Sequence, residues 1–210
     1  MRAYKDMAVV LSFTLFFVIT TANIAGALDK VPLSKILHDE SIEAMTYWNF
    51  GDDNFLVVVN SYIKKVEGLK LTGRKLVFYK KQTSGFVKAF EHDAQMDHFV
   101  GMIPLGDYDK NLMTVWVGGS AYHFNAFTVS NGKVISVLEA GSHNYPEFAD
   151  IDNDGQVEVL ISEGAFLIDA KENKVLSYPD KANVYKWDGK SYALIKTVPW
   201  KTRFNAGELK

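Results

Sequence analysis

The residues best suited to do chemistry lie in one short stretch, PEFADIDNDGQVEVLISEG, which covers residues 146–164. Four carboxylates occupy the first, third, fifth and ninth positions of a loop: Asp150, Asp152, Asp154 and Glu158. Like charges this close together repel one another, so we expect a cation to offset the repulsion. Calcium takes about six to eight oxygen ligands, which carboxylates and backbone carbonyls supply. The spacing therefore predicts that this loop holds a calcium ion (Ca2+).

Two neighbouring residues complete the predicted ligand set. The backbone carbonyl of Gln156 supplies a further oxygen, and Gly155 permits the backbone conformation that turns the chain around an ion. An EF-hand loop has a glutamate at its twelfth position and a helix on each side. Here the twelfth position is Ile161, and a strand-like run follows the loop, so the EF-hand is excluded. The alternative of a solvated polar turn without a metal stays open.

The acidic loop belongs to a pattern that occurs three times in the chain. Each copy is an acid-rich turn that leads into an apolar strand: GDDNFLVVV (residues 51–59), GDYDKNLMTVWV (106–117) and ADIDNDGQVEVLI (149–161). The first aspartates of the copies, Asp52, Asp107 and Asp150, are 55 and 43 residues apart. Such internal repetition predicts an architecture built from similar structural units.

A two-stranded hairpin is expected after each acidic strand. The three hairpins cover residues 75–92, 122–140 and 183–198, and they turn at Thr83–Gly85, Asn131–Gly132 and Asp188–Gly189. Asn-Gly and Asp-Gly are strong hairpin signals, and the flanking strands are rich in β-branched and aromatic residues. Units of roughly 40 to 60 residues with about four strands are typical of propeller blades. The chain is therefore predicted to be all-β, with about three degenerate propeller-like blades in an open or partial propeller.

The third loop resembles the calcium loop of the FG-GAP/VCBS repeat, the blade unit of integrin-alpha-like β-propellers. The matching residues, preceded by PEFAD and followed by the strand VEVLI, are Asp150, Asp152, Asp154, Gly155 and Glu158. The resemblance implies a blade-type all-β fold and these calcium ligands: Asp150, Asp152, Asp154, the backbone of Gln156, and Glu158. The chain spells out neither an FG nor a GAP signature, and Glu158 stands where aspartate is commoner in the family.

The other two acidic loops depart further from the family pattern. The second loop contains Asp107, Asp109 and Asn111 but lacks the glycine, and the first keeps only Asp52, Asp53 and Asn54. Calcium is therefore predicted at the third loop and is not expected at the first. Whether the second loop binds a metal stays open.

The N-terminal residues predict export. Arg2 and Lys5 precede an uncharged run from Met7 to Leu28, and Ala25–Ala27 forms a small-residue cleavage pattern. Residues 1–27 are thus predicted to be a signal peptide, and the protein to be periplasmic or secreted, without stable membrane insertion once the signal is cleaved. An uncleaved membrane anchor is the alternative, since about 20 apolar residues span a bilayer.

The rest of the chain divides into three parts. Apolar residues at helical spacing predict that residues 28–50 form a helical N-terminal segment that covers one end of the sheets. Residues 51–200 are expected to form the β-blade repeat domain, and residues 201–210 a loose C-terminal tail. The chain has 23 basic and 25 acidic residues and no basic patch, which argues against a nucleic-acid partner. It has no cysteine and therefore no disulfide.

Two further groups of residues could form sites. Two histidines and three carboxylates that would suit zinc or another transition metal lie within eight residues: Glu91, His92, Asp93, Asp97 and His98. The alternative is a polar connection between two blades. Exposed Trp116, Trp187 or Tyr185 would suit carbohydrate stacking, although aromatic residues in strands are mostly core.

No catalytic residue is assigned, because the chain has no cysteine nucleophile, nucleophile elbow, phosphate-binding loop or dinucleotide fingerprint. The expected function is a non-catalytic binding or interaction module for a protein or glycan, whose chains associate as a homo-oligomer if that completes a propeller. The alternative is a secreted hydrolase or carbohydrate-binding protein on a propeller-like scaffold, with Glu91, Asp93 and Asp97 as the first carboxylates to consider.

Overall fold

The computed structural model is all-β, with three four-stranded antiparallel sheets and one small two-stranded sheet. It describes residues 30–37, 39, 41–95, 97–106, 111–164, 167–169, 174–177 and 179–200. The predicted signal peptide, the C-terminal tail, and Asp107 and Asp109 of the second acidic loop lie outside the described residues. Within the described part, no helix is long and apolar enough to cross a membrane.

Each large sheet has four strands. The first sheet contains β1 (Ile42–Phe50), β2 (Asp53–Val66), β3 (Leu69–Gln82) and β4 (Gly85–Gln95), adjacent in chain order. The second contains β5 (His98–Leu105), β6 (Asn111–Gly118), β7 (Ala121–Ser130) and β8 (Lys133–Ser142), also in chain order. The third contains β9 (Glu147–Ala149), β10 (Glu158–Glu163), β13 (Lys181–Trp187) and β14 (Tyr192–Pro199), with the hairpin of β11 (Leu167–Asp169) and β12 (Lys174–Ser177) inserted after β10.

The same local plan recurs in all three sheets. The acidic loop joins the first strand to the second, and a hairpin supplies the remaining two strands. The three predicted hairpins are confirmed as the antiparallel pairs β3–β4, β7–β8 and β13–β14. The strands in front of the acidic loops, β1, β5 and β9, were not part of the predicted unit. They bring each unit to four strands.

The helix predicted over the N-terminal segment is wrong for most of its length. Only α1 (Leu33–Leu37) is helical, and Ile42–Phe50 is strand β1. The spacing of Ile42, Met45 and Trp48 suits a helix, but the segment is also rich in β-branched and aromatic residues. Pairing with Asp53–Asn60 of β2 satisfies its backbone, buries Trp48 and leaves Met45 exposed. The tertiary partner therefore overrides the local pattern.

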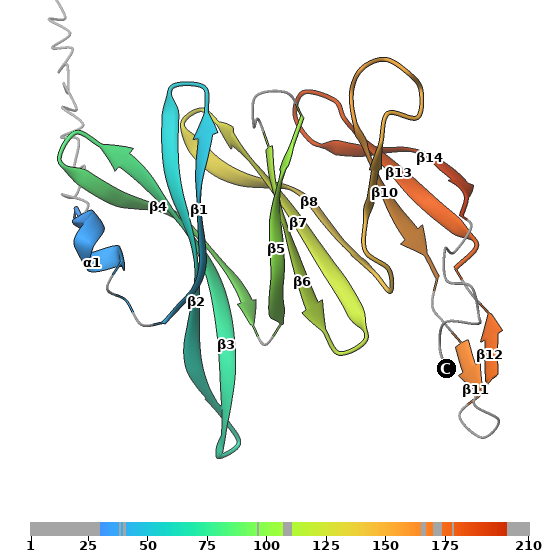
Figure 1. Cartoon of the computed structure of the whole chain (residues 1–210), viewed down its shortest axis with the longest axis horizontal. Coiled ribbons are helices and arrows are strands. Elements are labelled where there is room, and N and C mark those ends of the chain that lie inside the picture. The colour runs from blue at the N-terminus through green and yellow to red at the C-terminus, as the bar shows by residue number, and fades with distance from the viewer. Residues whose placement is uncertain are drawn as a thin grey trace, which may run out of the picture.

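The three sheets stack face to face along the longest axis of the molecule (Figure 1). One apolar cluster lies between the first and second sheets, around Trp48, Phe78 and Trp116, and another lies between the second and third, around Met113, Phe124 and Val159. The second strand of each sheet is buried on both faces, which explains its unbroken apolar run. In β2, for example, Val57 faces the second sheet and Leu56 faces the opposite side.

Helix α1 covers the outer face of the first sheet, as predicted for the N-terminal segment (Figure 1). Its Ile36 is 5 % exposed and packs in one cluster with Leu56, Val58 and Phe86. Val31 holds the preceding chain against β4 through two backbone hydrogen bonds with Phe86, of 2.8 and 3.0 Å. The four hydrophobic clusters are all made of residues from Val31 to Trp200.

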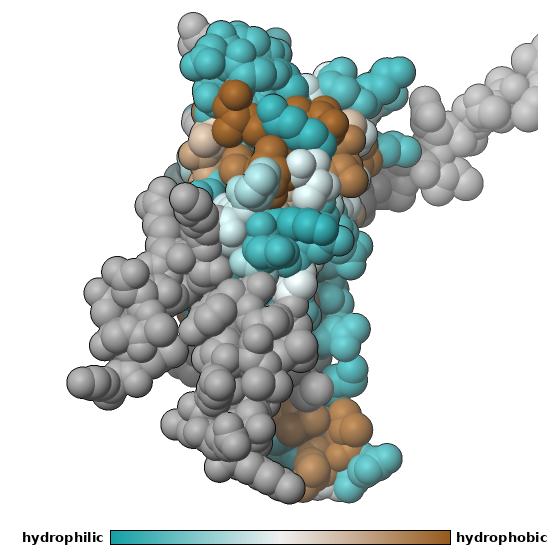
Figure 2. Space-filling model, turned by 90° about the vertical axis from the view of Figure 1, so that its right-hand side faces the viewer, coloured by the Kyte–Doolittle hydropathy of each residue, from teal (hydrophilic) through white to brown (hydrophobic). Residues whose placement is uncertain are grey.

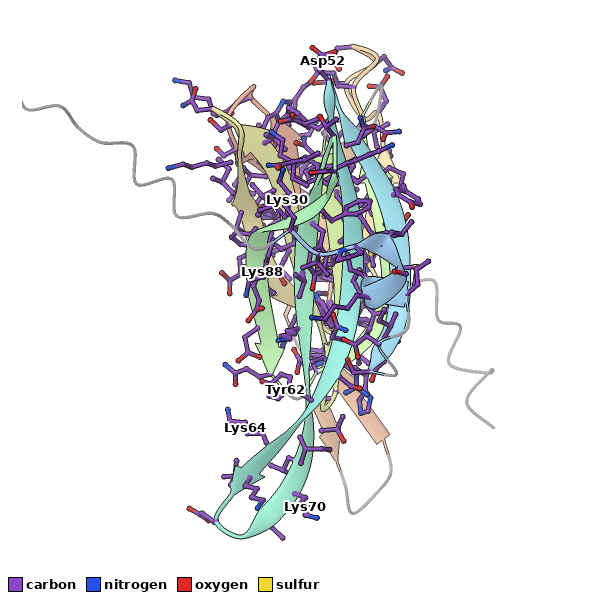
Figure 3. The ribbon with its side chains drawn as sticks, turned by 90° about the vertical axis from the view of Figure 1, so that its left-hand side faces the viewer. Lys30, Asp52, Tyr62, Lys64, Lys70 and Lys88 are labelled. Carbon is purple, nitrogen blue, oxygen red and sulfur yellow. The ribbon has the colours of Figure 1, made fainter. Side chains whose placement is uncertain are left out.

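The hairpin of β2 and β3 extends well beyond the other strands, and its end, residues 63–72, is called the arm below (Figures 1 and 3). Figure 2 shows hydrophobic residues gathered at this lower end of the molecule, with hydrophilic ones beside them. The base of the arm is fixed by Tyr62, whose ring lies directly against Gly73 in the space a larger residue would fill. The Tyr62 hydroxyl donates a 2.7 Å hydrogen bond to Asp93 of β4.

We expect that Ile36→Ala will lower the free energy of unfolding by about 2–5 kcal/mol, because it leaves a cavity between α1 and the first sheet. Denaturant unfolding measures this change. The matched control is Leu37→Ala on the neighbouring helical position, which is 49 % exposed and should cost no more than about 0.5 kcal/mol. Equal losses in the two variants would show that α1 does not pack as described.

Candidate metal centre

The candidate metal centre lies in the loop that joins β9 to β10, residues 150–157. The loop is tight because two of its residues have left-handed backbone conformations, Asn153 at φ 60° and Gly155 at φ 85°. Asparagine and glycine are the residues that adopt this conformation most readily. The loop therefore turns sharply twice within five residues of Asp150.

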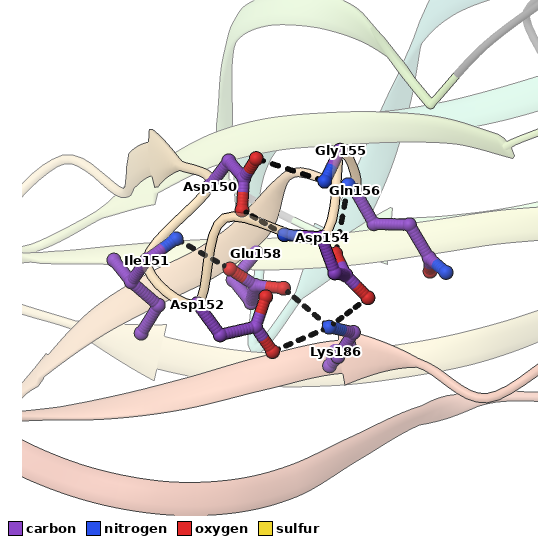
Figure 4. Close-up of polar contacts among 8 residues, drawn as sticks. All are labelled: Asp150, Ile151, Asp152, Asp154, Gly155, Gln156, Glu158 and Lys186. Carbon is purple, nitrogen blue, oxygen red and sulfur yellow. Dashed lines mark hydrogen bonds and ion pairs between the residues drawn. The ribbon is translucent and has the colours of Figure 1, made fainter.

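Asp150 organises the loop from its first position (Figure 4). Its Oδ1 accepts the N–H of Asp154 at 3.1 Å, and its Oδ2 accepts the N–H of Gly155 at 2.9 Å. Asp154 in turn accepts the N–H of Gln156 on Oδ1 at 2.9 Å. These bonds between carboxylates and backbone are typical of Asx-rich turns, and they point the carboxylates of the loop towards its inner side.

Glu158 is the buried member of the group. It is the first residue of β10 and is 0 % exposed. Its Oε2 accepts the N–H of Ile151 at 2.8 Å and so ties the start of the strand to the start of the loop. Its Oε1 is buried without a hydrogen-bond partner. A buried carboxylate oxygen with no donor is costly unless a cation compensates its charge.

A cation from β13 reaches this oxygen. The ammonium of Lys186 lies 2.6 Å from Asp152 Oδ2, 2.6 Å from Asp154 Oδ2 and 3.2 Å from Glu158 Oε1 (Figure 4). Hydrogen bonds to Asp152 and Asp154 raise the pKa of Lys186 above its usual range, so it is charged at neutral pH. The hydrogen bond from Lys186, followed by the one from the Gln156 backbone, lowers the pKa of Asp154.

The contacts of Lys186 show that the carboxylates of the loop are arranged to bind a cation. Oxygens of Asp150, Asp152 and Glu158 lie within 4.8 Å of one another, which is a group that could hold a metal ion. Three carboxylates contact this one ammonium and a fourth, Asp150, lies beside them, so the group has an excess of negative charge. Lys186 supplies one positive charge, and its ammonium donates to oxygens of Asp152, Asp154 and Glu158 that a metal ion would otherwise use. The donor set therefore fits a hard divalent cation.

The predicted ligands are brought together to different degrees. Asp150, Asp152 and Glu158 converge directly, and Asp154 joins them through its contact with Lys186. Gln156 contributes its N–H to the loop, and its carbonyl remains a predicted ligand. The oxygens that the loop pattern placed at one, three and nine are thus confirmed as neighbours in space.

The described parts of the other two loops do not form comparable groups. Asp53 lies at the start of β2 and pairs with Lys80 at 2.7 Å, and Asp52 lies at the exposed turn before it. Asn111 of the second loop is the first residue of β6, is 2 % exposed, and donates to the Tyr192 hydroxyl at 3.3 Å. Asn111 therefore packs between the second and third sheets.

The histidines and carboxylates proposed for zinc are separated. Glu91 pairs with Lys75 and Lys88, and Asp93 accepts from Tyr62. Their neighbour His92 faces Phe127 on the other side of β4, with ring centres 5.7 Å apart. Among the described residues, the only group of three or more potential ligands close enough for a metal is the one around Glu158.

A cavity of about 530 Å3 lies between the first two sheets, with His92, Asp97, His123 and Glu139 on its walls. Asp97 contacts the His123 ring nitrogen Nδ1, and it lies so close to Gly118 that any side chain there would collide with its carboxylate. Burial lowers the pKa of His92, although Glu139 opposes the shift. The cavity therefore brings imidazole and carboxylate groups next to apolar ones in the interface between these two sheets.

The aromatic residues considered for carbohydrate binding differ in exposure. Trp116 is 1 % exposed and donates its Nε1–H to Thr114, so it is core. Tyr185 and Trp187 are partly buried. Trp187 packs against Tyr192 and lines a cavity of about 650 Å3 whose wall includes Gly155 and Gln156 of the acidic loop.

Comparison with known proteins adds no identity: no protein-family model matches the chain, and no curated protein matches it significantly. The interpretation of the site therefore depends on its own geometry.

Lys186 and His123 are the functional candidates that spacing did not reveal. β10 and β13 pair Val159 with Tyr185, so the next step of the same register places Glu158 opposite Lys186. The inserted β11–β12 hairpin separates the two residues in sequence and hides this pairing. The sequence offered one signal for this contact, namely that Lys186 is a basic residue just before the predicted Asp188–Gly189 turn.

We expect that Lys186→Met will lower the urea midpoint of unfolding in the presence of a chelator, because it leaves the Glu158 charge buried without a partner. The difference from wild type should shrink or reverse when a divalent cation is added. Lys196→Met on the exposed β14 is the matched control and should unfold like wild type. An unchanged midpoint for Lys186→Met would mean that its three contacts do not stabilise the loop.

We expect the protein to lose stability as the pH falls below about 6.5, the ordinary pKa of histidine. The pKa of His92 is lower in the folded state than in the unfolded chain. As the pH falls, the unfolded chain is protonated first, and this protonation stabilises it relative to the folded state. Denaturant unfolding at neutral and acidic pH measures the loss, which should be smaller in His92→Gln. The same substitution at the exposed His98 should leave the pH dependence as it is in wild type.

Proposed function

We propose that the chain is an exported calcium-binding protein of propeller-like β-blades that acts as a non-catalytic interaction module in the periplasm or outside the cell. The calcium site is the loop from Asp150 to Glu158, and its ligands are the carboxylates of Asp150, Asp152, Asp154 and Glu158 with the carbonyl of Gln156. The role of calcium is structural, because the ligands span the junction between the loop and the start of β10.

The observation that supports this proposal best is the buried Glu158. Its Oε1 is fully buried, forms only a 3.2 Å ion pair with Lys186, and lies beside two further carboxylates. Burial of a carboxylate at the first residue of a strand is unfavourable, and a solvated turn without a metal does not compensate for it. A site that binds a divalent cation does, because the buried ligand fixes the ion to the core of the third sheet.

Calcium is favoured over a transition metal by the chemistry of the donors. Every candidate ligand atom is an oxygen, and no histidine or cysteine lies in the loop. Carboxylates and carbonyls suit calcium, whereas imidazole and thiolate suit zinc and copper. The ammonium of Lys186 competes for the same oxygens, so we expect calcium to bind more weakly than it would without this lysine.

The likeness to FG-GAP/VCBS blades rests on the residues of the third loop, and the three stacked four-stranded sheets are consistent with a partial propeller. A protein or glycan partner, or a second copy of the chain, would bind to such a scaffold. Association through the outer face of the first sheet would have to displace α1, because Ile36 packs there. Self-association is therefore expected through other faces or edges.

A second candidate function is hydrolysis or binding of a carbohydrate. The observation that favours it is the cavity with the Asp97–His123 contact and Glu139, since paired acidic and imidazole groups can exchange protons with a hydroxylated ligand. If calcium had no effect on the protein, this cavity would be the next site to study.

We expect calcium to raise the melting temperature of the chain from Leu28 to Lys210. At a calcium concentration about 100-fold above the dissociation constant, the rise should be roughly 5–10 °C, because only the folded loop binds the ion. Differential scanning calorimetry with calcium and then with excess chelator measures it. Asp152→Ala should remove most of this rise.

The matched control is Asp52→Ala, which removes an exposed acid from the first loop and should keep the full calcium-dependent rise. A rise that survives in Asp152→Ala would place calcium elsewhere. No rise in wild type would reduce the acidic loop to a polar turn held by Lys186.

A further inference from the structure

The arm is a second candidate interaction site, and it does not involve the proposed calcium ligands. It consists of the two ends of β2 and β3 beyond Tyr62, where no other strand of the described residues pairs with them (Figure 3). Glu67 and Gly68 form its turn with φ values of 49° and 85°, which is the tight two-residue hairpin geometry. The tip is therefore a narrow ribbon that ends in a short turn.

Large apolar side chains are exposed along this ribbon. Ile63 is 64 % exposed, Leu69 is 65 % exposed and Val66 is 38 % exposed. A ribbon of only two strands has no core of its own to bury them. Exposed aliphatic side chains gathered at one projecting tip indicate an interaction surface.

Lysines accompany the apolar residues. Lys64, Lys65 and Lys70 are all exposed, and none of them forms an ion pair among the described residues. The register places Lys65 directly opposite Lys70, a like-charge pair that destabilises the ribbon unless an anion lies near it. Glu67 at the turn is the only acidic residue of the arm. The chain as a whole has a net charge of −2, so the positive arm contrasts with it.

The register also shows which way the side chains point. Val66 pairs with Leu69 on one face of the ribbon, and Ile63 pairs with Thr72 on the opposite face. Lys64 lies on the first face, and the Lys65–Lys70 pair lies on the second. Apolar and basic groups therefore occur on both faces of the same tip. A flat protein surface would contact one face only, whereas a lipid interface surrounds an inserted ribbon.

The spacing along the ribbon fits the depth of a membrane interface. Strands rise roughly 3.3 Å per residue, so the positions of Ile63 and Val66 are about 10 Å apart. Apolar groups of peripheral proteins enter a bilayer by about 5–10 Å. The three lysines lie behind the tip within this range, where their long side chains can reach anionic headgroups while their stems stay apolar.

The base of the arm is held firmly enough to present the tip. Tyr62 lies against Gly73 and donates to Asp93, and this bond raises the pKa of Tyr62 to about 12. Next to it, Arg74 donates to Glu43 of β1 at 2.6 Å and to the backbone of Asp97. The ribbon is thus joined to both neighbouring strands of its sheet at the point where it leaves the body.

We propose that the arm docks the protein onto a lipid bilayer that contains anionic headgroups, with Val66 and Leu69 entering the interface and Lys64, Lys65 and Lys70 contacting the headgroups. The attachment is peripheral and reversible, because two inserted aliphatic side chains and three lysines do not span a bilayer. Binding removes apolar surface from water and places anions beside the Lys65–Lys70 pair. It requires neither calcium nor a second protein.

The test is flotation of the chain from Leu28 to Lys210, which retains every residue of the four hydrophobic clusters. Vesicles of phosphatidylcholine with about 30 % phosphatidylglycerol should bind the chain, and vesicles of phosphatidylcholine alone should bind it much more weakly. The binding should weaken as the salt concentration rises, because the charges are exposed. Excess chelator is present throughout, so that failure of this test and failure of the calcium proposal are separate results.

Two variants divide the arm into its two chemical parts. Replacement of Lys64, Lys65 and Lys70 by glutamine should weaken binding on the order of a hundredfold, at roughly fivefold for each lysine. Leu69→Ser should weaken it roughly tenfold without changing the melting temperature, because the side chain is exposed.

The matched controls use exposed residues elsewhere in the sheets. Glutamine at Lys133, Lys190 and Lys196, and Leu194→Ser, should bind the vesicles within about twofold of wild type, because these residues lie outside the arm and do not enter the interface. Absence of binding to anionic vesicles would overturn the proposal. So would binding that depends on the lysines but not on Leu69, which would identify the partner as an acidic protein or polymer.

Discussion

Every large sheet of this protein has two apolar faces, and each face needs a cover. The second strand of each sheet causes this requirement, because its apolar residues alternate between the two sides without a polar face. The middle sheet is covered by its neighbours, and the outer face of the first sheet is covered by Ile36 of α1. Stacking of sheets supplies the stability that a chain without cysteines cannot gain from disulfides. The loops are left at the ends of the strands, where they are free to carry chemistry.

The acidic loop shows how this scaffold supports a charged site. Glu158 is both a residue of a buried strand and a member of the acidic group, so its carboxylate is taken out of water by the packing of the sheet. The charge then has to be balanced, and Lys186 balances it from the adjacent strand. An ammonium neutralises one charge and donates at most three hydrogen bonds, whereas calcium carries two charges and takes about six to eight oxygen ligands. The lysine and the metal are therefore alternatives for the same oxygens, and the packing of Glu158 is the reason that one of them is needed.

Two other features, the cavity and the arm, place polar or charged side chains beside the apolar packing of the sheets. The cavity between the first two sheets exists where Asp97 fits over Gly118 and contacts His123. The arm exists because β2 and β3 continue pairing after the neighbouring strands have ended. Asp97 lies in the short connection between β4 and β5, and the arm is an extension of two strands, so in both cases neighbouring strands position the groups. The acidic loop, the cavity and the arm use different residues of the scaffold, so the proposed metal and bilayer contacts would not compete with a ligand in the cavity.

Local chemistry was enough to predict the hairpins at Asn131–Gly132 and Asp188–Gly189, the apolar strands after the acidic loops, and the convergence of Asp150, Asp152 and Glu158. The geometry of a turn and the positions of side chains within a short loop depend on residues close in sequence. They can therefore be predicted from the order of residues alone. Pairing between distant segments decided the rest. Ile42–Phe50 is a strand because β2 lies beside it. Lys186 meets Glu158 because β13 pairs with β10 across an inserted hairpin, and His123 meets Asp97 because β6 pairs with both β5 and β7. Contacts of this kind depend on register and on packing over long sequence separations, and the spacing of residues along the chain does not record either.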